Sequence, residues 1–146
     1  MGRYLIAYLA TGVVFIGMDA TWLSQMGPRL YMRYLGDMLT ATPSLVPAVL
    51  FYLIYLFGVV YFCVAPALKT GRWIKVLQNG VVLALCAYAT YDLTNQATMR
   101  IWSTRVTVFD LVWGVIVTVT SASAGFFIAR RMTSGGGRDA KVRSAV

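Results

Sequence analysis

The sequence of 146 residues contains no histidine and no glutamate, and it has only two cysteines. The lack of histidine excludes a Ser-His-Asp triad and a zinc site built on imidazole, and two cysteines are too few for a cysteine-ligated metal centre. Cys63 and Cys86 both fall in apolar segments, where a small buried side chain is their usual role. We therefore expect no metal site and no cofactor.

Charged residues are also scarce. They make up 12% of the chain and hydrophobic residues 59%, whereas a soluble domain has about 25% charged residues. The net charge is +8, but the basic residues stand at the ends of apolar segments and in a short tail, not on one soluble face. This distribution predicts a membrane protein in contact with lipids and argues against a nucleic-acid partner.

Four apolar segments of roughly 20 residues are each long enough to cross a hydrocarbon core of ~30 Å as a helix. They are Tyr4–Ser24, Leu45–Leu68, Lys75–Met99 and Arg105–Ala129. We predict an all-α polytopic membrane protein, a bundle of four transmembrane helices formed by residues 1–130. Residues 131–146 are rich in Gly, Ser and Arg and are predicted to form a disordered basic cytoplasmic tail.

The connection between the first two spans has a helical apolar pattern. Leu30, Tyr31, Tyr34 and Leu35 recur at helical spacing, and basic residues lie on the opposite face. This pattern predicts an amphipathic helix that lies in the membrane interface.

Lysine and arginine indicate the orientation of the bundle. With four spans, both termini and the middle connection share one side, which carries nine basic residues from Arg3 to Arg143, whereas four lie on the other side. Basic residues are enriched on the cytoplasmic side of bacterial membrane proteins, so both termini are predicted to be cytoplasmic.

Three of the five acidic residues lie inside predicted spans. At 1.5 Å rise per residue, Asp19 is roughly 22 Å and Asp92 roughly 25 Å along outward-running helices, and Asp110 is roughly 8 Å into a helix that runs back. All three are therefore expected in one layer, in the outer third of the membrane. Because an isolated charge there is costly, they should face the bundle interior.

Neighbouring residues supply polar and aromatic partners for these acids. Tyr88, Asp92 and Asn95 share one helix face with Tyr91 beside it, and Trp22 and Trp113 each follow an aspartate by three residues. Tyr52 and Tyr55 are placed to complete the ring, and Arg100 and Arg105 are candidate counter-charges. The candidate ligand- or ion-binding residues are Asp19, Asp92, Asp110, Asn95, Tyr88, Tyr91, Trp22 and Trp113.

These residues have two interpretations that the sequence leaves open. They form either an interhelical hydrogen-bond network that fixes packing or a site for binding, ion handling or catalysis. A stripe of small residues in the fourth span favours close helix contact, within the chain or in a homodimer. The stripe consists of Gly114, Thr118, Ser121, Ala122 and Gly125.

Several motifs together resemble a known family, the small bacterial membrane proteins grouped as domain-of-unknown-function family 2177. They are Asp19 with Trp22 and Leu23, the FYLIYLFGVVYF run before Pro66 and Ala67, Asn79-Gly80, the AYATYDLTN block of Ala87 to Asn95, and Asp110 with Trp113-Gly114. The resemblance covers about Tyr4 to Ile128 and implies a four-helix protein of the bacterial inner membrane. It implies no activity. This chain has Trp102-Ser103 where members often have Trp-Pro, and Gln96 where they have an aliphatic residue.

Three functions compete at this stage. The first is a binding or transport protein for a small solute, cation or proton, with a polar pocket open to the outer face; a homodimer is expected because four helices make a thin pathway. The second is an accessory or structural subunit of a larger membrane complex. The third is a membrane-embedded enzyme that modifies lipids, with one aspartate as general base and a second as general acid. The residues favour binding over catalysis and leave the ligand open.

Overall fold

The computed structural model describes residues 2–40 and 42–143, with all of their side chains except those of residues 37 and 134–143. This described part is helical and contains no strand. Its elements are α1 (Gly2–Met26), the π-helical turn η1 (Gly27–Tyr31), α2 (Met32–Leu35), the 3₁₀ turn η2 (Gly36–Met38), α3 (Leu45–Val59), the π-helical turn η3 (Val60–Val64), α4 (Ala65–Thr70), α5 (Ile74–Thr98) and α6 (Thr104–Arg143).

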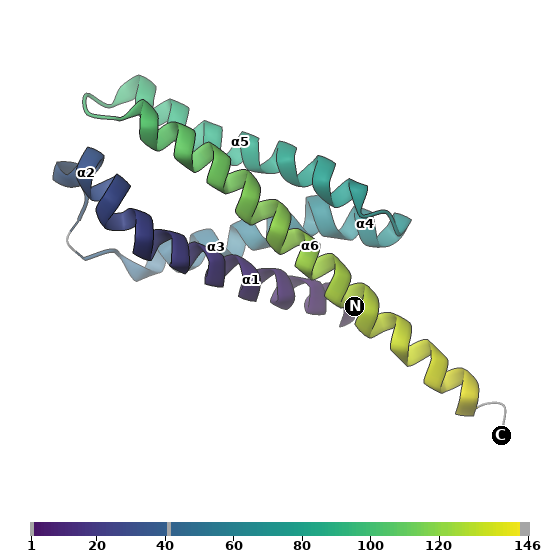
Figure 1. The fold of residues 1–146 in the computed structure, drawn as a ribbon. Helices are drawn as coiled ribbons and strands as arrows, with labels where there is room; N and C mark the ends of the chain where they lie inside the picture. Colours follow the sequence, from purple (N-terminus) through teal and green to yellow (C-terminus); the bar gives the residue numbers. More distant parts are fainter. Residues whose placement is uncertain (1, 41, 144–146) are drawn as a thin grey trace.

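Four helical segments are long and apolar enough to cross a membrane: Gly2–Leu35, Leu45–Thr70, Ile74–Thr98 and Thr104–Thr133. They confirm the predicted all-α architecture with four transmembrane helices. Figure 1 shows the N-terminal end of α1 and the turn between α4 and α5 at one end of the bundle, with α2 and the connection between α5 and α6 at the other. This arrangement places the odd-numbered and even-numbered spans in opposite directions.

Helix α6 is central, because it packs along both α1 and α5. Glycines permit these two close approaches. A Cβ atom added at Gly125 would overlap the Thr11 hydroxyl and lie 2.9 Å from the Ala7 carbonyl oxygen, and one added at Gly114 would overlap the ring of Tyr88. The small-residue stripe of α6 is therefore used for packing within the chain.

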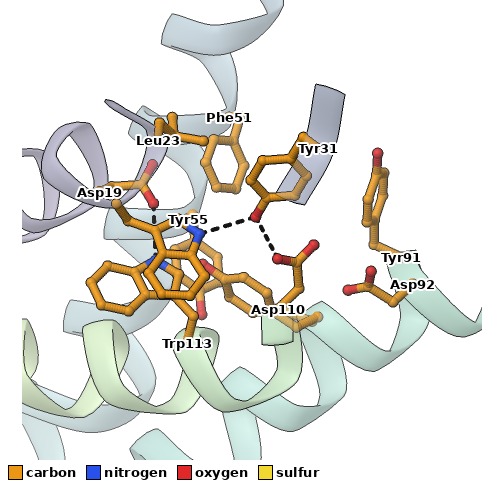
Figure 2. Close-up of a pocket in the computed structure, with 12 residues that line it drawn as sticks. Asp19, Leu23, Tyr31, Phe51, Tyr55, Tyr91, Asp92, Asp110 and Trp113 are labelled. Atoms are coloured by element: carbon orange, nitrogen blue, oxygen red, sulfur yellow. Dashed lines mark hydrogen bonds between the residues drawn. The ribbon is translucent and has the colours of Figure 1, made fainter. Parts of the chain in front are cut away.

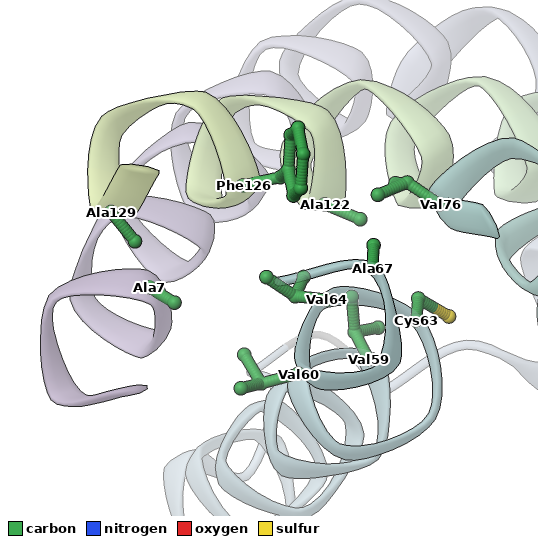
Figure 3. Packing of buried hydrophobic residues seen from close by; sticks show 10 residues of the cluster. All are labelled: Ala7, Val59, Val60, Cys63, Val64, Ala67, Val76, Ala122, Phe126 and Ala129. Atoms are coloured by element: carbon green, nitrogen blue, oxygen red, sulfur yellow. The ribbon is translucent and has the colours of Figure 1, made fainter. Parts of the chain in front are cut away.

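The main apolar cluster lies on the side of the bundle near the N-terminal end of α1. Figure 3 shows how it joins all four spans, with Phe126 of α6 above the residues of η3. Its members are Ala7, Val59, Val60, Cys63, Val64, Ala67, Val76, Ala122, Phe126 and Ala129. Cys63 is fully buried here, as expected for a small packing residue, whereas Cys86 is exposed on α5.

Both π-helical turns are associated with proline. Pro28 lies within η1, and Pro66 follows η3. Because Pro66 has no N–H, the Phe62 carbonyl lacks its usual partner four residues later. Asn79 Nδ2 of α5 donates a hydrogen bond of 2.8 Å to this carbonyl. The second span is thus fixed to α5 at the level of η3.

The segment predicted as an interfacial amphipathic helix continues from α1 through η1 and α2. Its Leu30 and Leu35 side chains are buried and form a cluster with Val106 of α6. This apolar face therefore packs on the protein at these two positions. Its location in the membrane interface stays a prediction.

The predicted boundary between a transmembrane domain of residues 1–130 and a disordered tail of residues 131–146 also stays a prediction. Helix α6 has helical backbone as far as Arg143, and residues 144–146 lie outside the described residues.

Substitution of Gly125 by Ala is expected to weaken the contact between α6 and α1. The new methyl group meets backbone at Ala7 as well as a side chain, so helix α1 must shift, and overpacking of this kind costs about 1–3 kcal/mol. Thermal unfolding in detergent measures the loss. Gly17→Ala in α1 is the matched control, because a Cβ atom there meets nothing within 4 Å. Equal stability of the two variants would contradict the close approach.

Candidate functional site

A cavity of about 520 Å³ lies between the four spans, toward the end of the bundle that carries α2 (Figure 2). Residues of α1, η1, α3, α5 and α6 form its wall. They are Asp19, Trp22, Leu23, Tyr31, Phe51, Tyr55, Ala87, Tyr88, Tyr91, Asp92, Asp110 and Trp113.

Seven of the eight candidate residues line this cavity: Asp19, Trp22, Tyr88, Tyr91, Asp92, Asp110 and Trp113. The eighth, Asn95, is half-buried on α5 and is not part of the wall. The three aspartates come from α1, α5 and α6, and all three reach the same space. Their convergence on one cavity agrees with the expectation that they face the bundle interior, and their common level in the membrane stays a prediction.

Asp19 is held by two donors from other spans. The Tyr52 hydroxyl of α3 donates a hydrogen bond of 2.6 Å to Oδ2, and Trp113 Nε1 of α6 donates one of 3.2 Å to Oδ1. Each carboxylate oxygen thus has one partner. Tyr55, one turn after Tyr52, lines the cavity and shares a hydrogen bond of 2.8 Å with Thr118 of α6. Of the two tyrosines that the sequence placed in the ring, Tyr55 lines the cavity and Tyr52 contacts Asp19 without lining it.

A stacked indole pair continues the wall from Asp19 toward Asp110. The rings of Trp22 and Trp113 lie 4.4 Å apart between centroids, at an interplanar angle of 8°. Trp22 Nε1 donates a hydrogen bond of 3.0 Å to the Tyr31 hydroxyl, which in turn donates to Asp110 Oδ1. Only 8% of Asp110 is exposed. A chain of donors therefore connects α1, η1 and α6 around the cavity (Figure 2).

Asp92 differs from the other two aspartates. Its side chain is fully buried, and neither carboxylate oxygen has a hydrogen-bond partner. Figure 2 shows its carboxyl group directed toward Asp110, whereas the hydroxyl of neighbouring Tyr91 points away. The two carboxyl groups are close enough that one proton between them would form a hydrogen bond. Two adjoining acids without a donor between them are energetically unfavourable unless a proton or another cation joins them.

Arginine does not balance these acids. Arg105 Nη1 donates a hydrogen bond of 2.6 Å to the Tyr34 hydroxyl, and its guanidinium lies 5.7 Å from the centre of the same ring. The prediction of Arg105 as a counter-charge is therefore wrong. Arg100 is exposed in the connection between α5 and α6. Within the described residues, the hydrogen-bond partners of Asp19 and Asp110 are tyrosine and tryptophan only.

Tyr31 was missed as a site residue. Tyr31 recurs with Leu30, Tyr34 and Leu35 at the spacing of an amphipathic helix. This pattern predicted that its side chain lies on the apolar face of an interfacial helix. The π-helical turn η1 instead directs its hydroxyl into the cavity, between Trp22 and Asp110. Pro28 was the available signal, because a proline inside a helical pattern displaces the residues that follow it.

Gln96 fixes the exit from α5. Its Nε2 donates a hydrogen bond of 3.0 Å to Thr104 Oγ1, and its Oε1 accepts one of 2.9 Å from Thr107 Oγ1. Trp102 Nε1 also donates to Thr107, at 3.0 Å. These bonds fix the start of α6 relative to α5, six residues before Asp110.

The chemistry available in the cavity is acceptance of hydrogen bonds and attraction of positive charge. Carboxylates supply the acceptors, and the faces of tyrosine and tryptophan rings attract cations. In the part of the chain that the structure describes, no three His, Cys, Asp or Glu side chains come close enough to share a metal ion.

Alanine substitutions at Asp110 and Asp92 should have opposite effects on stability. Asp110→Ala leaves the Tyr31 hydroxyl without its acceptor, which costs about 1–3 kcal/mol of unfolding free energy. Asp92→Ala removes a carboxyl group that has no partner, so the melting temperature in detergent should stay equal or rise. A loss at Asp92 as large as that at Asp110 would show that Asp92 has a structural partner.

Comparison with known proteins gives a family and no activity. The family described as "Predicted membrane protein (DUF2177)" matches residues 4–127. Searches of curated proteins and of solved structures find no match to the chain. The match covers all four spans and the whole wall of the cavity. The chain therefore belongs to the DUF2177 family of predicted membrane proteins.

Proposed function

We propose that this protein binds a small cationic solute in the cavity between its four spans and carries it into or across the membrane. One observation supports the proposal above all. Asp19, Asp92 and Asp110, which lie far apart along the chain, meet at one cavity, and among the residues that the structure describes no lysine or arginine is hydrogen-bonded to them. The negative charge of the site is thus left for a ligand or for protons.

The energetics of the bilayer support this interpretation. A carboxylate placed in a hydrocarbon environment costs about 2.5–3.5 kcal/mol on insertion scales, so three of them at one level are expensive unless they serve a site. If the acids served packing alone, each would have hydrogen-bond donors within the protein, as Asp19 has. Asp92 has no such donor, and this favours the binding interpretation over the packing one.

The size and walls of the cavity support an organic cation. A volume of about 520 Å³ is in the range of pockets for small organic ligands. Trp22, Trp113 and Tyr88 present ring surfaces beside the acids, and aromatic faces with nearby carboxylates are a common arrangement for ammonium groups.

The proposed setting is the bacterial inner membrane, with both termini cytoplasmic. The end of the bundle that holds Arg3, Lys69, Arg72 and Lys75 is then cytoplasmic, and the cavity lies nearer the outer face. A homodimer is proposed for the transport step, because four helices make a thin pathway; its interface would lie outside the small-residue stripe of α6, which packs within the chain.

Titration of the detergent-purified protein with ethylammonium, phenethylammonium and ethylguanidinium tests the proposal. Trp22 and Trp113 line the cavity, so tryptophan emission should change with saturation, and calorimetry should give the same dissociation constant. The triple variant Asp19→Asn, Asp92→Asn, Asp110→Asn should bind at least about tenfold more weakly, since a hydrogen bond to a charged group contributes about 1.5–3 kcal/mol.

The triple variant must retain helical content by circular dichroism for the comparison to hold. Trp73→Phe is the optical control, because Trp73 bonds Ser123 and does not line the cavity. Binding that is unchanged in the triple variant, or no saturable binding of any of the three compounds to the native chain, would overturn the proposed function.

A further inference from the structure

We infer that Asp92 anchors the ligand and that the ligand's cationic group carries N–H donors, as a primary or secondary ammonium or a guanidinium does. This inference rests on the proposed function and names the class of cation that the cavity takes. It distinguishes N–H cations from quaternary ammonium compounds, which have the same charge and no donor.

The first support is the state of the Asp92 carboxyl group. It lines the cavity, its side chain has an exposed fraction of 0%, and both oxygens lack a hydrogen-bond partner. Buried carboxyl groups are ordinarily paired, because an unpaired one loses the hydrogen bonds of water without replacement. A group of this kind beside a cavity is explained when the missing donor belongs to a molecule that enters the cavity.

The second support is the way in which the other acids are occupied. Asp19 accepts hydrogen bonds from Tyr52 and Trp113, one at each oxygen, and Asp110 accepts one from Tyr31. A carboxylate can accept about four hydrogen bonds, so Asp92, whose two oxygens accept none, has the largest remaining capacity of the three. A ligand with several N–H groups therefore finds its main acceptors on Asp92.

The third support is the position of Asp110. Figure 2 shows the Asp92 carboxyl group directed toward it, and the two interact electrostatically. An N–H cation placed between them compensates both charges and donates to both residues. A quaternary ammonium group cannot donate, and its methyl shell keeps its charge farther from the oxygens, so its attraction relies on the aromatic rings.

The fourth support is the apolar part of the wall. Leu23 and Phe51 line the cavity and are each 46% exposed, and Tyr91 is 63% exposed beside Asp92. These side chains offer contact to the hydrocarbon or aromatic part of an amine whose head group lies at Asp92. The ligand class is thus an organic amine or guanidine with an apolar substituent.

The test compares two probes that differ only at nitrogen, phenethylammonium and its N,N,N-trimethyl derivative, by calorimetry on the full chain in detergent. The native protein should bind the primary ammonium at least about tenfold more tightly. In Asp92→Asn the affinity for the primary ammonium should fall by about tenfold or more, and that for the quaternary compound should change much less. Thr90→Val is the control on the same helix, because its hydroxyl bonds only the Cys86 carbonyl of α5.

The outcomes separate this inference from the proposed function. If both probes bind the native chain with equal affinity, the inference is overturned and the proposed function stands. The same holds if Asp92→Asn weakens the binding of both probes by the same factor. Failure of both probes to bind the native chain would overturn the inference, and the proposed function would fall with it only if ethylammonium and ethylguanidinium also fail to bind. The comparison of probes on the native protein decides the matter even if the variant does not fold.

Discussion

The close approach of α6 to α1 and α5 sets the geometry of the whole bundle. It depends on glycine at two positions of α6, where a larger residue would meet Tyr88 on one side and Ala7 and Thr11 on the other. Small residues of this kind allow helices to pack tightly in lipid, where no hydrophobic force drives them together. Because the two contacts fix the height of α6 against both neighbours, they also fix the level at which Asp110 meets Asp19 and Asp92.

The acids are stabilised by neutral donors. Tyrosine hydroxyls and an indole N–H hold Asp19 and Asp110, and each comes from a different helix than the acid it binds. Such bonds keep the carboxylates compatible with an apolar bundle while their negative charge is not cancelled, as it would be by arginine. The network thus fixes the helices relative to one another and leaves the carboxyl group of Asp92 without a hydrogen-bond donor.

The sequence was sufficient for the architecture and for most of the cavity wall. Span lengths follow from apolar runs, and the convergence of the three aspartates on one cavity agrees with the expectation from helix rise, since regular helices keep their register over a span. The spacing of Trp22 from Asp19 and of Trp113 from Asp110 pointed to indoles near the acids; both indoles line the cavity, but Trp113 donates to Asp19 of another helix and Trp22 donates to Tyr31. The stripe in α6 correctly predicted close packing but not which helices it would meet.

The errors arose where regular helix geometry fails or where several partners compete. Tyr31 enters the cavity through a π-helical turn, which periodicity cannot anticipate. Asn95 shares a face with Asp92 in projection, yet the cavity does not extend that far along α5. Arg105 had two possible partners, an aspartate in the cavity and Tyr34 of α2. It bonds Tyr34, and this choice depends on how α2 lies against α6. Which acid stays unpaired depends on side-chain directions that no one-dimensional pattern contains.

The stacked tryptophans have an optical consequence. Because the rings of Trp22 and Trp113 lie 4.4 Å apart and nearly parallel, we expect their excited states to couple, unlike those of Trp73 and Trp102 elsewhere in the bundle. One ring belongs to α1 and the other to α6, and their coupling falls steeply with separation. The protein therefore carries a native spectroscopic ruler for the distance between these two helices, and no label has to be attached to read it.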